Sequence, residues 1–124
     1  MLEKTVPRIL IVEDEPLVSI LIEDVLAEIG WDFVGPARSV SEALALAEVE
    51  ALSAAVLDVN LDGMPVDPVS EALERRGIPY LLMTGYQRAE LPLSLRHAPV
   101  LEKPFEPMTL LDAVRSLIGA EVHG

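Results

Sequence analysis

The sequence predicts an α/β fold in which one parallel five-stranded sheet is covered by helices on both faces. Short apolar runs of strand length alternate with segments of helical period, a pattern typical of consecutive β-α units. Five such units follow one another without an internal repeat or a linker. The length of 124 residues suits one domain with a sizeable core. We therefore expect a single domain over residues 1–124, with no output domain attached.

The first unit has the clearest pattern. Residues 9–12 are rich in β-branched side chains and predict a strand that ends at the acids following it. Apolar residues then recur at helical spacing over 17–29, and Gly30 supplies a helix stop. We expect a strand followed directly by an amphipathic helix.

The second and third units are shorter. Residues 33–35 predict a weaker strand, and Ser41 opens an alanine-rich helix after it. Residues 54–57 are apolar throughout and predict the third strand, which ends at Asp58. This places an acid at the end of a buried strand.

The fourth unit begins with a loop marked by Gly63 and Pro65. A short helical face over 69–73 follows, and Gly77 helps to stop it. Residues 80–83 predict the fourth strand.

The segment over 85–99 is broken by two prolines, so we expect a loop with at most a short helix and little apolar surface to anchor it. Residues 100–101 predict a brief last strand, and apolar positions over 110–118 predict a closing helix.

Composition excludes several kinds of function. The formal net charge of -12 disfavours DNA and RNA partners, which require clustered basic residues. Because the chain has no cysteine, it has neither disulfides nor thiolate metal sites. No apolar stretch reaches the ~18 residues that a membrane span requires. We expect a cytoplasmic protein without a membrane partner.

Polar residues follow four of the five predicted strands: Glu13 and Asp14, Asp58, Thr84, and Lys103. Each alone has an ordinary structural explanation as a solvated loop acid, a turn cap or a surface charge. In an open parallel α/β sheet, however, ligands bind outside the carboxyl ends of the strands. The convergence of these side chains at one sheet edge favours a common site.

Three carboxylates at such a site repel one another by about 4 kcal/mol per pair at ~4 Å and an effective dielectric constant of ~20. A hard divalent cation relieves that repulsion, and Mg²⁺ is commonly held by one or two carboxylates together with a phosphate. One carboxylate then remains to act as a nucleophile and form an aspartyl-phosphate. Asp58 is the best candidate, with Lys103 and Thr84 placed to bind phosphoryl oxygens.

Four segments resemble the signature segments of response-regulator receiver domains, in order and across the whole chain: Val12-Glu13-Asp14-Glu15-Pro16, Leu57-Asp58-Val59-Asn60-Leu61, Met83-Thr84-Gly85-Tyr86 and Glu102-Lys103-Pro104-Phe105. The resemblance implies a flavodoxin-like (βα)5 doubly wound fold with strand order 2-1-3-4-5. It also implies a stand-alone receiver of a two-component phosphorelay. Such a phosphoprotein is not an enzyme and assists only its own phosphorylation and dephosphorylation.

The same resemblance implies that Asp58 takes its phosphoryl group from a phosphohistidine of a sensor histidine kinase, and that the domain then signals to a downstream protein by changing its conformation. Asp14, Asp58 and the backbone carbonyl of Asn60 would hold Mg²⁺ or Mn²⁺, with Glu13 acting through water. The family also leads us to expect a cis peptide bond before Pro104.

Two departures bear on the subfamily and on the switch. Residues 78–86 resemble the FAT-GUY variant receivers, which work with HWE-type kinases, although Leu82-Met83 stands where that motif has Phe-Ala. Val100 occupies the position where typical receivers carry an aromatic switch residue. We therefore expect Tyr86 to act as the switch, by reordering when the site is phosphorylated.

Two alternatives remain. Haloacid-dehalogenase-like aspartyl phosphatases use a similar residue set, but their second aspartate would stand where this chain has Asn60. A non-phosphorylated interaction module of the same fold is the other alternative, although retention of all five polar positions disfavours it. His97 and His123 are expected to be solvated, since one lies in a proline-bounded loop and the other in a tail.

Overall fold

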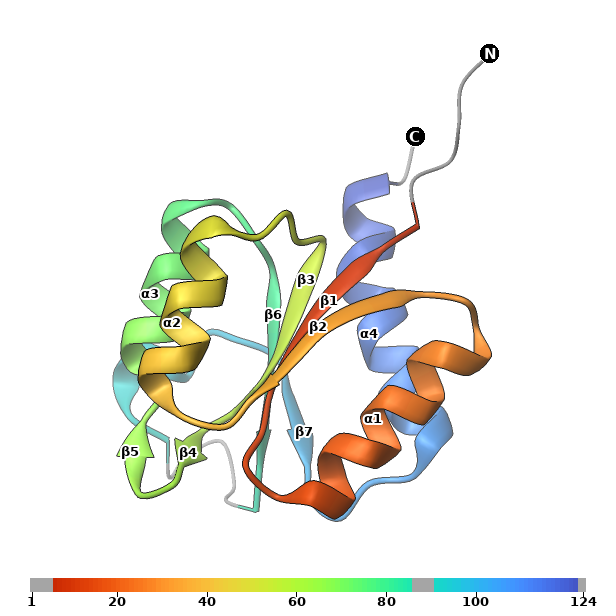
Figure 1. Ribbon diagram of the computed structural model, residues 1–124. Helices are drawn as coiled ribbons and strands as arrows, with labels where there is room; N and C mark the ends of the chain where they lie inside the picture. Colours follow the sequence, from red (N-terminus) through yellow and green to blue (C-terminus); the bar gives the residue numbers. More distant parts are fainter. Residues whose placement is uncertain (1–5, 86–90, 123–124) are drawn as a thin grey trace.

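The computed structural model describes residues 6–85 and 91–122, with side chains as far as Gly119. A parallel five-stranded sheet forms its centre, in the order β2-β1-β3-β6-β7 (Figure 1). Its strands are β1 (Arg8–Val12), β2 (Asp32–Ala37), β3 (Ala54–Asp58), β6 (Tyr80–Thr84) and β7 (Val100–Glu102). Counted as five strands in chain order, this is the predicted order 2-1-3-4-5, so the flavodoxin-like fold is confirmed.

Helices cover the sheet on both faces, with α1 and α4 on one side and α2 and α3 on the other (Figure 1). They are α1 (Pro16–Glu28), α2 (Val40–Val49), α3 (Asp67–Arg75) and α4 (Pro107–Val122). Strand β1 shows why both faces are needed. Ile9 and Ile11 belong to the core beneath α1 and α4, whereas Leu10 and Val12 belong to the core beneath α2 and α3.

Two predicted helices, α2 and α4, have different ends in the structure. Helix α2 is capped by Ser39 instead of Ser41, because the hydroxyl of Ser39 accepts the backbone N–H of Glu42 at 3.1 Å. Helix α4 extends beyond the predicted 110–118 at both ends, and its proline lies in the first turn, where the missing N–H costs nothing.

The loop after β3 is more regular than predicted. It forms an antiparallel hairpin of β4 (Asn60–Leu61) and β5 (Met64–Pro65). The two turn residues, Asp62 and Gly63, have φ angles of 50° and 80°. Positive φ at both central positions is what a tight two-residue hairpin turn requires, and Asp-Gly supplies it readily.

The segment over 91–99 contains one 3-10 turn, η2 (Leu93–Leu95), which agrees with the expected loop and short helix. The expectation of little anchoring surface was wrong for these residues, since Leu91, Leu95 and Ala98 are almost completely buried against the α2 and α3 side of the sheet. These three residues have the helical spacing i, i+4, i+7, but Pro92, Pro99 and the exposed Leu93 obscure that period in the sequence.

In the part of the chain that the structure describes, no helix has the length and apolar composition needed to cross a membrane.

Candidate functional site

Three carboxylates meet at the carboxyl edge of the sheet. Glu13 and Asp14 directly follow β1, and Asp58 ends β3. Strands β1 and β3 are parallel neighbours, which brings their ends together. One oxygen from each of the three side chains lies within 4.8 Å of the other two. The sequence predicted this convergence from strand ends alone.

Glu13 is the most deeply placed of the three, with no exposed surface. Its Oε2 accepts the backbone N–H of Glu15 at 3.1 Å, and its Oε1 lies 2.9 Å from Nζ of Lys103. Burial raises the pKa of Glu13 to about 7, although the contact with Lys103 acts in the opposite direction. An added cation would favour the ionised carboxylate.

Asp58 faces both an amide and a cation. Its Oδ1 accepts the backbone N–H of Asn60 at 3.3 Å, and its Oδ2 lies 3.4 Å from Nζ of Lys103. The residue is 8% exposed and forms part of the lining of an open hollow. Asp58 therefore presents its carboxylate to an incoming group while its neighbours hold the side chain in place.

Lys103 reaches this hollow from the loop after β7. Its backbone N–H donates to the carbonyl of Thr84 at 2.8 Å, and the peptide bond to Pro104 is cis. Burial alone would lower the pKa of Lys103, but its contacts with Glu15, Glu13 and Asp58 raise that pKa above its ordinary range. The ammonium stays charged beside the carboxylates.

Comparison with known proteins gives this arrangement a family. A family model for the response regulator receiver domain matches residues 9–115. This chain belongs to that family. Receiver domains are signalling modules rather than typical enzymes, and they bind Mg²⁺ in an acidic pocket.

Two curated regulators contain a related receiver domain. The transcriptional regulatory protein PdtaR of Mycobacterium tuberculosis is 29% identical over 113 residues, which are 89% of this chain and 54% of PdtaR. The phyllosphere-induced regulator PhyR of Methylorubrum extorquens is 33% identical over 105 residues, which are 81% of this chain and 39% of PhyR. This chain thus spans about half the length of PdtaR and less than half the length of PhyR.

A solved structure resembles it over nearly its whole length. The solution structure of SdrG from Sphingomonas melonis is 39% identical and superposes with a TM-score of 0.81, covering 94% of this chain and 99% of that chain.

The remaining predicted site residues of the receiver domain lie around the same edge. Asp14 is half-buried, and its Oδ2 accepts the backbone N–H of Asp62 at 3.0 Å, which ties the hairpin turn to the acids. Thr84 is buried at the end of β6, between β3 and β7. Asn60 is exposed and lines the hollow. Tyr86 lies outside the described residues.

The donor set of the receiver domain fits a hard divalent cation. Glu13, Asp14 and Asp58 offer carboxylate oxygens, the ligands that Mg²⁺ and Mn²⁺ take. The described residues of this cluster include no histidine, whose nitrogen would instead suit zinc or copper.

Glu15 is the site residue that sequence reasoning missed. Its Oε1 lies 2.9 Å from Nζ of Lys103, although the two residues are 88 positions apart. Glu15 follows the acid pair directly and looked like an ordinary solvated residue at the end of a strand. No local signal showed that its side chain would turn toward the lysine.

Proposed function

We propose that this receiver domain accepts a phosphoryl group on Asp58 from a phosphohistidine of a sensor histidine kinase, and then signals to a downstream protein by changing its conformation. The observation that carries this proposal is the position of Asp58, whose carboxylate lies among two further acids and the half-buried ammonium of Lys103. A nucleophilic carboxylate, a cation site and a lysine together provide what phosphoryl transfer to aspartate requires.

In this proposal an oxygen of Asp58 attacks phosphorus as the phosphorus–nitrogen bond to the donor imidazole breaks. Lys103 pairs with one phosphoryl oxygen and Thr84 donates a hydrogen bond to another, so that negative charge is neutralised where it gathers. The hydrogen bond from the backbone N–H of Asn60 keeps the other oxygen of Asp58 in place during the attack.

A magnesium or manganese ion would be held by Asp14, Asp58 and the backbone carbonyl of Asn60, with Glu13 acting through water. When bound, the ion supplies positive charge that offsets the crowded carboxylates and the phosphoryl oxygens. The raised pKa of Glu13 supports a cation at this site. Burial disfavours the ionised form of this carboxyl group, and a nearby cation would stabilise that form.

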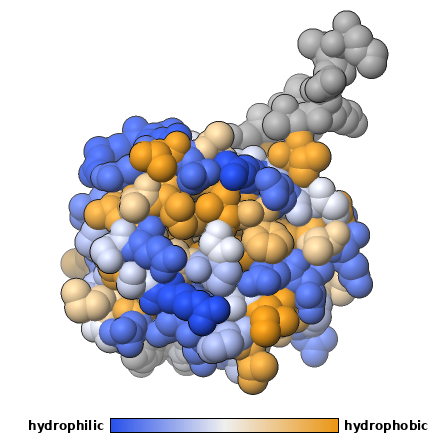
Figure 2. Space-filling model, in the orientation of Figure 1, coloured by the Kyte–Doolittle hydropathy of each residue, from blue (hydrophilic) through white to orange (hydrophobic). Residues whose placement is uncertain are grey.

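The kinase would cover the apolar rim beside the hollow. A groove between α1 and the loop after β7 shares Glu15 and Lys103 with the acidic hollow. Leu17 and Ile20 of α1 form this apolar rim, since they are 84% and 50% exposed. Apolar atoms gather over the lower end of α1 in Figure 2. A donor that brings phosphohistidine to Asp58 must lie against this rim, where burying apolar surface favours association.

We further propose that the domain works in the cytoplasm and belongs with the FAT-GUY receivers, whose kinases are of the HWE type. The support is the Thr84-Gly85-Tyr86 segment together with similarity to PhyR and to SdrG, for which a BeF3-activated conformation is also solved. We propose a downstream protein as the second partner of this receiver domain, in addition to the kinase.

The deciding experiment is phosphorylation by acetyl phosphate in the presence of Mg²⁺, followed by intact mass. We expect wild-type protein to gain one acid-labile phosphoryl group and Asp58→Asn to gain none. Asp62→Asn, which alters an exposed acid of the same hollow, serves as the control and should still be phosphorylated. Labelling of Asp58→Asn at the wild-type rate would contradict the proposal.

A further inference from the structure

Three carboxylates surround the ammonium of Lys103. Its Nζ lies 2.9 Å from Oε1 of Glu13, 2.9 Å from Oε1 of Glu15 and 3.4 Å from Oδ2 of Asp58. Among the described residues, the contact with Glu15 has hydrogen-bond geometry and the other two are ion pairs. A phosphoryl oxygen that pairs with Lys103 must therefore compete with these carboxylates for the ammonium and its N–H donors.

The three acceptors differ in how readily they can leave. Glu13 is fully buried and is held by the backbone N–H of Glu15. Asp58 would itself carry the phosphoryl group. The side chain of Glu15 is 61% exposed and can turn to water, where an ion pair of this kind contributes little to stability.

We propose that Glu15 is a positioning residue that competes with the phosphoryl group for Lys103. This inference rests on the proposed phosphoryl transfer to Asp58 and deepens it. In the resting domain, Glu15 holds the ammonium beside Asp58 and adds negative charge to the entrance of the hollow. When the phosphoryl group arrives, Glu15 releases Lys103 and turns outward.

The displaced carboxylate has a favourable place to go. Glu15 is the N-cap residue of α1, yet its side chain makes no capping hydrogen bond, because the carboxylate is turned to Lys103. Helix N-termini carry free N–H groups and partial positive charge that stabilise a nearby carboxylate. Release from Lys103 therefore exchanges one favourable electrostatic contact for another, which keeps the exchange easy to reverse.

The test measures the dissociation constant of beryllofluoride, a phosphoryl mimic, at saturating Mg²⁺ in the full chain. We expect Glu15→Gln to lower this constant about two- to fivefold, as expected for loss of an exposed ion pair that competes with the anion. Binding of Mg²⁺ alone should not become tighter, since removing an acid disfavours a cation. Tighter binding of the anion without tighter binding of the cation is a signature that a general change in folding would not produce.

Two matched variants separate pairing from charge. Asp62→Asn removes one negative charge from the same hollow, but Asp62 is not one of the three carboxylates around Lys103, so this variant should shift beryllofluoride binding less than Glu15→Gln. Glu15→Asp keeps the charge but shortens the side chain by one methylene, and should also bind beryllofluoride more tightly than wild type.

Equal beryllofluoride affinity in wild type and Glu15→Gln would overturn the inference, as would equal shifts in Glu15→Gln and Asp62→Asn. Failure of the wild-type protein to bind beryllofluoride or to accept phosphate would instead contradict the proposed function itself.

Discussion

Glu13 sets the acid-base behaviour of the acidic site. It has no exposed surface, and burial raises its pKa to about 7 from an ordinary value of 4.5. Its charge acts directly on two neighbours, because Nζ of Lys103 lies 2.9 Å from its Oε1 and the backbone N–H of Glu15 donates to its Oε2. The charge of this one side chain therefore changes with pH around a pKa of about 7.

The first prediction concerns folding of the metal-free protein. Because the folded pKa of Glu13 exceeds the unfolded one, its contribution to stability is full below pH 4.5 and is lost as pH rises toward about 7. The loss should approach about 1.4 kcal/mol per pH unit. The free energy of unfolding, measured by urea denaturation from pH 4 to 8, should show this loss in wild type and not in Glu13→Gln. Parallel profiles for the two proteins would contradict the prediction.

The second prediction concerns Asp14, whose carboxylate is shared between the acid cluster and the hairpin turn. At a Mg²⁺ concentration about one hundred times the dissociation constant, mass action should stabilise the wild-type fold by about 2.7 kcal/mol. Asp14→Ala should lose most of this stabilisation in thermal denaturation. Asp112→Ala, in which an exposed acid of α4 is removed, is the control and should keep it. Equal stabilisation of Asp14→Ala and wild type would exclude Asp14 as a ligand.

Among the structural elements, β2 is the one with the tightest backbone requirement. The pairing of β1 with β2 shifts register between Leu10 and Val12, and Gly35 lies opposite this shift with a φ angle of 99°. A Cβ atom at Gly35 would lie 2.7 Å from the carbonyl oxygen of Ile11 and 2.7 Å from the backbone nitrogen of Ala37. Neither backbone atom can move without disturbing the sheet.

The third prediction follows from this crowding. Gly35→Ala should lower the free energy of unfolding by about 2–5 kcal/mol, through the positive φ angle and the two contacts together. Gly30→Ala is the matched control, because its φ angle of 78° is also positive but its Cβ would meet no atom within 4 Å. That variant should lose only about 1 kcal/mol. Similar losses in chemical denaturation would show that the close contacts at β2 have no effect.

The fourth prediction concerns the segment after β6. Val100 in β7 is half-buried and offers no aromatic ring for a switch. The residues over 91–98 are held against α3 by the 2.6 Å hydrogen bond from Ser94 to Asp67 and the 3.0 Å contact of His97 with Glu74. We expect beryllofluoride with Mg²⁺ to change amide exchange over 85–98, and Tyr86→Ala to weaken the response of partner binding to phosphorylation. Unchanged exchange at full site occupancy would exclude this switch.

Sequence reasoning succeeded where a local pattern and a global rule agreed. The meeting of Glu13, Asp14 and Asp58 follows from placing acids at strand ends in a parallel sheet, and the order of the strands was implied by the resemblance of four segments to receiver domains. It failed where tertiary contacts decided the outcome. The burial of Leu91 and Leu95 depends on a surface built by α3, and the turn of Glu15 toward Lys103 depends on a residue 88 positions away.

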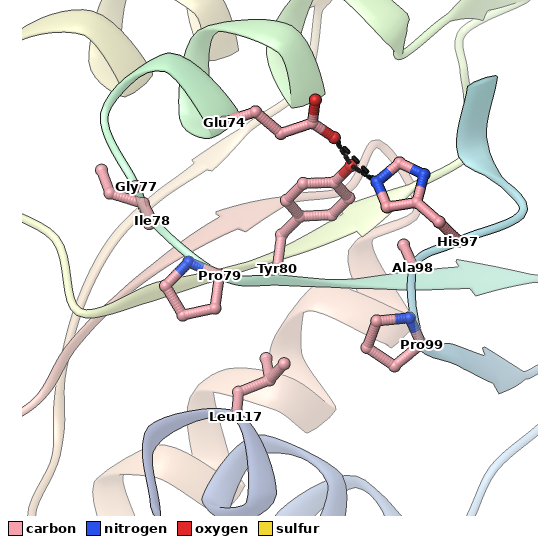
Figure 3. A pocket seen from close by; sticks show the side chains of 9 residues that line it. All are labelled: Glu74, Gly77, Ile78, Pro79, Tyr80, His97, Ala98, Pro99 and Leu117. Carbon is pink, nitrogen blue, oxygen red and sulfur yellow. Dashed lines mark hydrogen bonds and ion pairs between the residues drawn. The ribbon is translucent and has the colours of Figure 1, made fainter. Parts of the chain in front are cut away.

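At the scale of the whole molecule, a second polar cluster lies at the opposite end of the sheet from the acidic hollow. Tyr80 begins β6, and its hydroxyl donates to Glu74 of α3, while His97 contacts the same carboxylate (Figure 3). Prolines and Leu117 of α4 form an apolar floor beneath them (Figure 3). The cluster joins α3, β6 and the segment before β7.

The fifth prediction tests this cluster. Burial first, and then Glu74, raise the pKa of the Tyr80 hydroxyl above its ordinary value of 10.0. A raised pKa means that the contribution of Tyr80 to stability is full below pH 10 and is lost as pH rises above it. Tyr80→Phe should be less stable than wild type at pH 8 by about 1 kcal/mol, the usual effect of one hydrogen bond. The difference should shrink above pH 10 in denaturant titrations, and a constant difference would contradict the prediction.

The sheet separates the proposed kinase contact on α1 from the segment over 91–98, part of the region where we expect the switch. Val18 and Leu21 of α1 pack against the core shared with α4, whereas Leu61 of the hairpin and Leu91 of the later segment pack into the core under α2 and α3. The acidic hollow lies where the two cores meet. Input and output would thus occupy separate faces of the sheet, with Asp58 and its neighbours at the edge that both faces share, so that the transmitting face could acquire a new partner while the receiving face kept its kinase.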